Sequence, residues 1–129
     1  MVEYTYQQKI AIMRILLDII HADGIIDARE TFFFNKMKEI YNLKVEDYNV
    51  VKKKNSLLAL SQIKCFDNEQ KECFAKLMSR MIVIDEDVNV NEMNIYNIVC
   101  EFCHINFDFN EYVEEENMSN LTFSCSNNK

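Results

Sequence analysis

Acidic residues that could bind a cation occur twice in the sequence with the same spacing. The first stretch, residues 23–30, reads D-G-I-I-D-A-R-E, and the second, residues 85–92, reads D-E-D-V-N-V-N-E. Both fit the pattern D-x-x-[I/V]-[D/N]-x-x-E and lie 62 residues apart. Carboxylate oxygens are the ligands that calcium, magnesium and similar divalent ions prefer. The candidate metal ligands are therefore Asp23, Asp27, Glu30, Asp85, Asp87 and Glu92.

The same acidic residues also have a purely structural interpretation. Each motif lies between two apolar helical runs, where a helix-to-helix elbow is expected. Asp27 with Glu30, and Asn89 with Glu92, have the spacing of a capping box, in which the first residue caps a helix and the Glu bonds back to it. This interpretation leaves the first Asp of each motif unexplained.

An EF-hand is the closest alternative, because D-G-x-I-x-x-x-E is also the second half of a calcium loop. In that register the first and third loop positions fall on Ile19 and His21, and in the second copy on Met81 and Val83. None of these side chains supplies a carboxylate oxygen, and they belong to apolar helical stripes. The sequence therefore disfavours an EF-hand.

Residues 100–104, C-E-F-C-H, match the C-x-x-C-H string of haem attachment. The string lies inside an apolar helical run without an export signal, and a zinc site would need two further soft ligands. The chain also lacks a nucleophile elbow, a glycine-rich phosphate loop and an H-E-x-x-H motif. We expect a protein that is not an enzyme and has no small-molecule substrate.

The composition limits the fold class and the kinds of partner that the protein can bind. The 129 residues suffice for one domain, and one Gly and no Pro favour an all-α fold. A net charge of −7 argues against nucleic acid and anionic membranes as partners, and Lys52–Lys54, the only basic run, fits a solvated helix face. The five cysteines, no visible secretory signal and no 18-residue apolar stretch predict reduced thiols in a cytoplasmic protein.

Apolar periodicity predicts a compact bundle of about seven helices. They are expected at about 6–22, 28–41, 43–54, 56–64 and 68–82, with a sixth helix that begins after the Asn89 cap and a short seventh at about 110–116. When the sequence is aligned with itself after a shift of 62 residues, apolar residues align with apolar residues, for example Ile19 with Met81 and Phe33 with Ile95. We therefore predict one domain, 1–116, with pseudo-repeats at about 8–54 and 70–116. Residues 117–129 are polar and are expected to form a flexible tail.

An apolar helix ending in Ala22-Asp23-Gly24 and followed by Ile26 and Glu30 resembles the signature of tellurite-resistance TerB-like domains. The resemblance covers roughly residues 8–116. It implies an all-helical, internally duplicated unit of this length, associated with stress responses and metal ions. The family's acidic positions carry over onto Asp23, Glu30, Asp85 and Glu92. The second copy departs from the pattern, with Glu86 where the first has Gly24.

Two functions follow as expectations. The first is a TerB-like stress-response binding module, in which the acidic elbows hold a divalent cation or present a negative surface to a protein partner. The alternative is a purely structural or protein-interaction domain with capped elbows and no ion.

Overall fold

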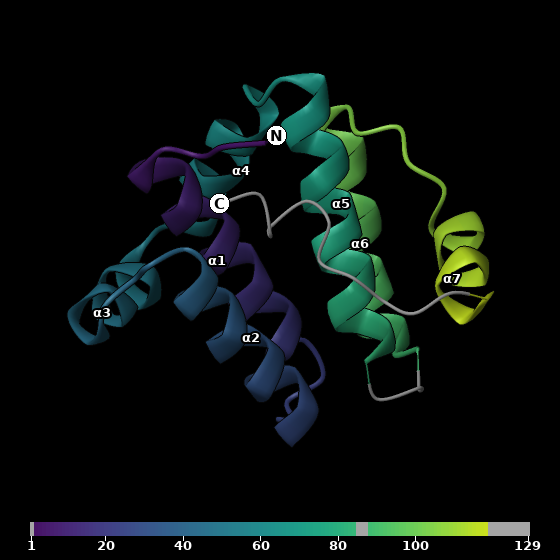
Figure 1. Ribbon diagram of the computed structural model, residues 1–129, viewed down its shortest axis with the longest axis horizontal. Coiled ribbons are helices and arrows are strands. Elements are labelled where there is room, and N and C mark those ends of the chain that lie inside the picture. The colour runs from purple at the N-terminus through teal and green to yellow at the C-terminus, as the bar shows by residue number, and fades with distance from the viewer. Residues whose placement is uncertain (1, 85–87, 119–129) are drawn as a thin grey trace.

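The computed structural model describes residues 2–84 and 88–118, and in these residues the protein is all-helical, without a strand (Figure 1). The predicted all-α class is confirmed, with seven helices in the described part of the chain. Their bounds are α1 Tyr6–Ile20, α2 Ala28–Ile40, α3 Val45–Lys53, α4 Ser56–Lys64, α5 Asn68–Val83, α6 Val90–Cys103 and α7 Phe109–Met118.

Helix α1 lies at the centre of the bundle and contacts α2, α3, α4, α5 and α6. Its apolar residues cover more than one face of the helix, so a single partner helix could not bury them all. Every residue from Ile10 to Ile20 except Arg14 and Asp18 is buried. Burial of these apolar side chains against five neighbouring helices stabilises the fold.

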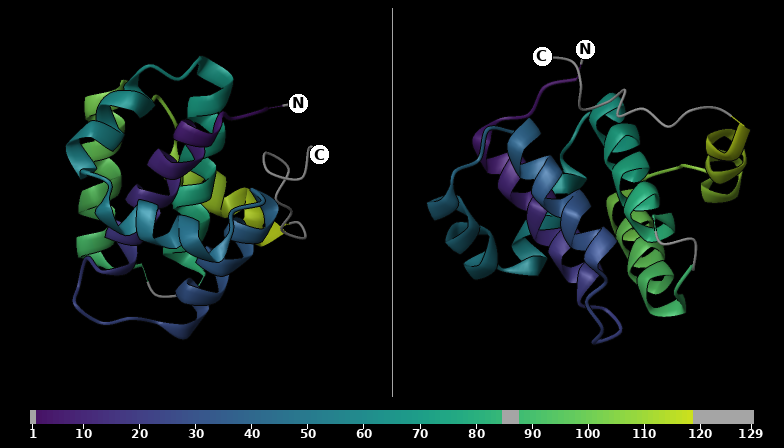
Figure 2. Two further views of the ribbon diagram at one scale, coloured as in Figure 1. Left: turned by 90° about the vertical axis from the view of Figure 1, so that its left-hand side faces the viewer. Right: turned by 60° about the horizontal axis from the view of Figure 1, so that its bottom comes forward.

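The loop between α1 and α2 lies at the same end of the molecule as the last turn of α5 and the first turn of α6 (Figure 2). Helices α1 and α5 begin 62 residues apart, and so do α2 and α6. This spacing is the one expected from the sequence shift, while duplication itself remains a prediction. We call residues 21–27 the first elbow, and Ile84, Val88 and Asn89, the described residues between α5 and α6, the second elbow.

The opposite ends of α1 and α5 also have related caps. Thr5 with Gln8, and Asp67 with Gln70, form reciprocal capping boxes at the two N-termini. The Nε2 atom of Gln70 donates to Oε1 of Gln8 over 3.3 Å. The two long helices are therefore joined by a side-chain contact between their first turns.

The cysteines differ from the expectation of reduced thiols. Cys65, Cys100 and Cys103 are free, but Cys73 is disulfide-bonded. The expectation is therefore wrong for Cys73, because an apolar position in a helical pattern does not show whether a cysteine has a disulfide partner. In the described residues no helix is long and apolar enough to cross a membrane.

The predicted C-terminal tail starts too early. Helix α7 continues through residue 117 to Met118, so the first two residues assigned to the tail are helical. Residues 119–129 lie outside the described part of the chain.

Candidate functional site

The two elbows are joined by a hydrogen bond between side chains. The Nδ2 atom of Asn89 donates to Oδ2 of Asp23 over 2.9 Å, across 66 positions of sequence. Both side chains are half-buried. Asp23 of the first motif and Asn89 of the second are therefore in contact, although 66 positions of sequence separate them.

The first elbow is shaped by Gly24 and Asp23. Gly24 has φ of +77°, a left-handed conformation that costs a residue with a Cβ energy. The other carboxylate oxygen of Asp23, Oδ1, accepts the backbone N–H of Ile25 over 2.9 Å. Each oxygen of Asp23 thus has a partner, one inside the first elbow and one on the second. These contacts explain the aspartate that helix capping alone does not.

Asp27 caps α2, as the sequence predicts. Its Oδ1 accepts the backbone N–H of Arg29 over 2.7 Å and lies 3.4 Å from the Nε atom of the same residue. The backbone hydrogen bond from Arg29, helped by the guanidinium charge, lowers the pKa of the Asp27 carboxyl below its ordinary value. Asp27 is therefore ionised at neutral pH and stabilises the start of the helix.

Asn89 has two functions at once in the second elbow. Its Oδ1 caps α6 by accepting from the backbone N–H groups of Asn91 and Glu92, over 2.8 and 3.2 Å. Its Nδ2 is then left to donate to Asp23. An ionised Asp could cap the helix but could not donate a hydrogen bond. The amide is therefore the side chain that suits both contacts.

The two glutamates of the motifs lie inside the protein. Glu30 is 1% exposed and Glu92 is 2% exposed, and they occupy matching positions in the first turns of α2 and α6. We predicted that they would close capping boxes, yet in α2 and α6 only the N-cap half forms, and the reciprocal boxes occur in α1 and α5. The prediction was wrong because it treated an inward-facing residue of the first turn as a surface residue.

The six predicted metal ligands are only partly brought together. Asp23 reaches the second elbow, Asp27 is bound to its own helix start, and Glu30 and Glu92 are buried. Asp85 and Asp87 lie outside the described residues. Among residues 2–84 and 88–118, no three His, Cys, Asp or Glu side chains form a group able to hold a metal ion.

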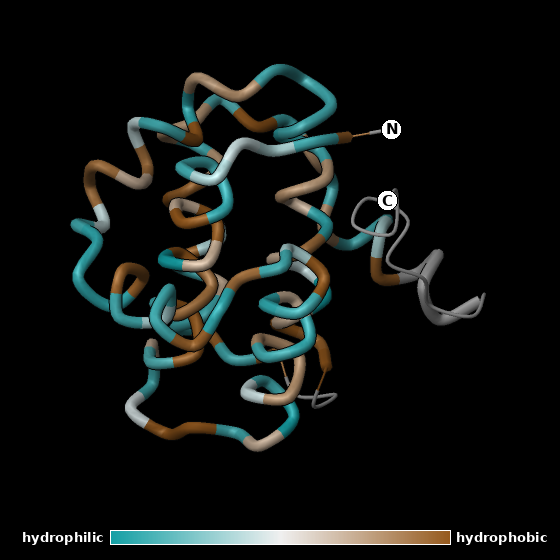
Figure 3. Tube along the Cα trace, turned by 60° about the vertical axis from the view of Figure 1, so that its left-hand side comes forward, coloured by the Kyte–Doolittle hydropathy of each residue, from teal (hydrophilic) through white to brown (hydrophobic). Residues whose placement is uncertain are grey.

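Four exposed aliphatic residues lie close in sequence to Asp23 and Asn89, and we did not identify them as exposed from the sequence. The exposed fractions of these residues are 70% for Ile25, 59% for Ile26, 48% for Val88 and 68% for Val90. Figure 3 shows a brown, hydrophobic stretch in the loop between α1 and α2, which contains two isoleucines in its sequence. Two adjacent isoleucines in a connection that starts with Asp-Gly were the available signal, since polar residues are usual in such turns.

We call the four aliphatic residues together with Asp23 and Asn89 the elbow surface. Val88 and Val90 flank Asn89, and Ile25 lies two residues after Asp23. Ile26 lies one residue further on. Because three residues span at most about 11 Å, the 2.9 Å hydrogen bond limits how far apart the backbones of the two aliphatic pairs can be. The elbow surface therefore contains both exposed aliphatic and half-buried polar side chains.

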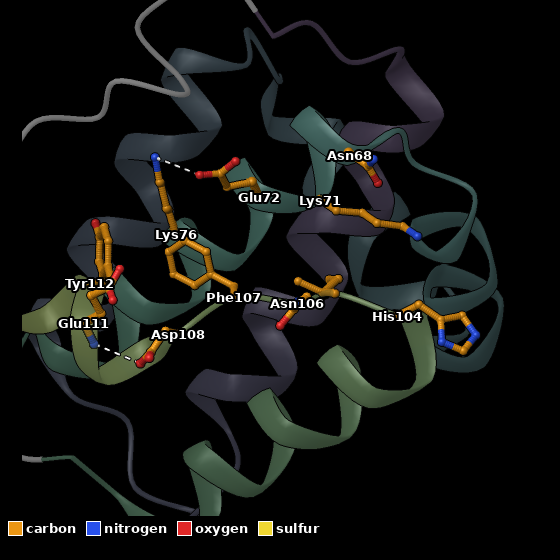
Figure 4. Close-up of a pocket in the computed structure, with 11 residues that line it drawn as sticks. Asn68, Lys71, Glu72, Lys76, His104, Asn106, Phe107, Asp108, Glu111 and Tyr112 are labelled. Atoms are coloured by element: carbon orange, nitrogen blue, oxygen red, sulfur yellow. Dashed lines mark hydrogen bonds and ion pairs between the residues drawn. The ribbon is translucent and has the colours of Figure 1, made fainter.

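A separate cleft of about 530 Å³ lies between α5, the segment 104–108 and α7 (Figure 4). Lys71 and Lys76 of α5 line it, opposite Asp108 and Glu111. Lys76 lies 3.7 Å from the Glu72 carboxylate, and Asp108 accepts the backbone N–H of Glu111. The cleft is lined by both lysines and carboxylates, and some of these groups already bind one another or the backbone. The lining therefore does not favour any one class of ligand.

The C-x-x-C-H string has no sign of reactivity. Cys103 is fully buried, its Sγ lies 3.5 Å from the Leu60 carbonyl oxygen, and burial raises the pKa of its thiol to about 11. Burial also raises the pKa of Cys100, whereas His104 is exposed and adopts a left-handed C-cap conformation. A nucleophilic or metal-binding cysteine needs the opposite change, toward thiolate.

Comparison with known proteins gives a shared fold. No family model and no curated protein matches this chain. A similar solved structure is the crystal structure of a protein of unknown function, PG1108, from Porphyromonas gingivalis W83. It has a TM-score of 0.71 and 16% sequence identity, and the match covers 91% of this chain and 92% of that one. The arrangement of the helices is thus one that a solved protein also adopts.

Proposed function

We propose that this protein is a non-catalytic binding module whose elbow surface docks a protein partner. The observation that carries the proposal is the Asn89–Asp23 hydrogen bond, which joins two elbows with exposed aliphatic side chains into one surface. Scattered apolar residues are normal on a protein surface, but grouped ones are typical of interaction sites.

The raised pKa values of two cysteine thiols near His104 in sequence support a non-catalytic function. Cys100 and Cys103, the thiols nearest to His104 in sequence, have pKa values that burial raises. Catalytic thiols are instead kept close to ionisation by neighbouring cations or helix N-termini.

A divalent cation bound at the elbows is the second candidate function. It is favoured by Glu30 and Glu92, two buried carboxylates in matching first turns at the end of the bundle that also holds Asp23. The resemblance to TerB-like domains, the link to stress responses and a cytoplasmic location also remain predictions.

Affinity purification with three matched baits tests the docking proposal. The baits are the wild type, Ile26→Ser/Val90→Ser on the elbow surface, and the control Leu57→Ser/Leu58→Ser on α4. The control removes aliphatic side chains of similar exposure, 72% and 60%. We expect proteins retained by the wild type and the control to be lost specifically from the elbow variant. Equal retention by all three baits would contradict docking at the elbows.

A further inference from the structure

We propose that the partner contacts the elbow surface through aliphatic side chains flanked by lysine or arginine. This inference rests on the proposed docking function and specifies the chemistry of the partner. It follows from the charges that accompany the exposed aliphatic residues on this surface and from their contrast with a second apolar surface of the same molecule.

Negative charge predominates at the elbows. Of the four carboxylates in the described residues of both elbows and of the first turns of α2 and α6, those of Glu30 and Glu92 are buried, so a partner can reach only the carboxylates of Asp23 and Asp27. The basic residue in the same segments, Arg29, is 3.4 Å from the Asp27 carboxylate and so is partly neutralised. The half-buried Asp23 and Asp27 lie beside the exposed isoleucines in sequence. A partner that covers the isoleucines must therefore approach carboxylates.

Helices α3 and α4 expose aliphatic residues in the opposite electrostatic setting. Val45, Val50, Leu57 and Leu58 are 85%, 44%, 72% and 60% exposed. Residues 44–64 contain five lysines against two acidic residues, Glu46 and Asp47. The molecule thus has two exposed apolar regions that differ in the sign of the nearby charge. A partner with basic side chains is favoured at the elbows and disfavoured at α3 and α4.

Other ligand classes fit the elbow surface less well. Nucleic acid and anionic lipid headgroups carry the same sign of charge as the carboxylates and would be repelled. A free divalent cation would be attracted, but it makes no use of four exposed aliphatic side chains. A protein segment with both aliphatic and basic side chains uses both features of the surface.

Two synthetic peptides provide the probes. One is an 18-residue amphipathic helix of leucine and lysine, and the other has the same pattern with glutamate in place of lysine. Binding of each fluorescent peptide is measured by anisotropy at low and physiological salt. The proteins are the wild type, Ile26→Ser/Val90→Ser, the α4 control Leu57→Ser/Leu58→Ser, and Asp27→Asn. The last variant keeps a good helix cap but removes one charge.

We expect the lysine peptide to bind the wild type and the α4 control at least tenfold more tightly than it binds the elbow variant. Asp27→Asn should weaken it about two- to fivefold, as the loss of one exposed ion pair does, and salt should weaken it further. The glutamate peptide should bind the elbow surface at least tenfold more weakly than the lysine peptide.

The outcomes separate this inference from the docking proposal. If the glutamate peptide binds as tightly and is equally sensitive to Ile26→Ser/Val90→Ser, the elbow surface docks a partner but the basic chemistry is wrong. If neither peptide responds to the elbow substitutions, both proposals are contradicted. If Asp27→Asn weakens binding of the lysine peptide but the serine substitutions do not, the peptide binds by charge attraction alone. The inference is then also overturned.

Discussion

Asn89 donates a 2.9 Å hydrogen bond to Asp23, so the N-cap residue of α6 is attached to the loop that follows α1, 66 positions away in the sequence. The contact uses the amide nitrogen of a residue whose oxygen is already occupied by the N–H groups of Asn91 and Glu92. Each elbow therefore helps to hold the other in place. We propose that the exposed aliphatic residues near this contact act as one surface.

The first prediction concerns this hydrogen bond. Asn89→Asp keeps the cap oxygen but places a carboxylate against Asp23, so it should destabilise the fold by about 1 kcal/mol or more through the lost hydrogen bond and charge repulsion. Adding Asp23→Asn restores a donor and an acceptor with their positions exchanged. We expect the double variant to recover most of the lost stability in urea unfolding. Additive losses would show that the two side chains are not coupled.

The second prediction is that alanine substitution at either of two buried residues destabilises the protein. Leu17 is 6% exposed and Met81 is fully buried. Substitution of either by alanine removes buried apolar atoms and leaves a cavity, which costs about 2 to 5 kcal/mol. Val45→Ala is the control, because Val45 is 85% exposed and should lose almost nothing. Urea midpoints that do not separate the buried sites from Val45 would contradict this core.

Much of this fold could be predicted from the sequence. The apolar period predicted α4 at Ser56–Lys64 with its observed bounds, and the first residue of α1 at Tyr6. Both results depend on local periodicity and capping, which the sequence contains directly. Helix ends were less accurate, since the last turn depends on contacts elsewhere.

The site could be predicted less well, for physical reasons. The identity of Asp27 and Asn89 as caps is local and was correct. The pairing of Asn89 with Asp23, the burial of Glu30 and the exposure of Ile26 depend on how distant helices pack. A single sequence contains no direct measure of such contacts.

The third prediction is a pH dependence at Asp27. Hydrogen bonding from Arg29 lowers the pKa of its carboxyl in the folded protein below the ordinary value of 3.8. The resulting stabilisation is present above that value and is lost as the pH falls through the folded pKa. Asp27→Asn retains a cap without a titrating group, so its urea midpoint should fall less than that of the wild type between about pH 5 and pH 2. Equal falls would contradict the assignment.

Thiol alkylation gives the fourth prediction. Cys65 is exposed, Cys100 is half-buried and Cys103 is buried with a thiol pKa of about 11. At pH 8 Cys103 should contain about a hundredfold less thiolate than a thiol of pKa 9.0 and react slowest with iodoacetamide. Peptide mass spectrometry should give the order Cys65, then Cys100, then Cys103. Fast labelling of Cys103 would mean that residues 100–104 are reactive after all.

Divalent ions separate the two candidate functions. If the elbows are only a docking surface, millimolar calcium, magnesium, manganese or zinc should leave the melting temperature unchanged. If they hold an ion, saturating metal should raise it in line with the affinity, and Asp23→Asn should reduce that increase. We expect no increase, because both oxygens of Asp23 already accept hydrogen bonds from the protein. An increase that Asp23→Asn abolishes would favour the cation instead.

The central claim is that two elbows, 62 residues apart in sequence, act as one binding surface. Titration of isotope-labelled protein with the leucine–lysine peptide, followed by amide chemical shifts, tests it most directly. We predict that the amides of Ile26 and Val90 shift together and saturate with the same dissociation constant, while those of Leu57 and Leu58 stay in place. Shifts confined to one elbow, or centred on α4, would contradict the claim.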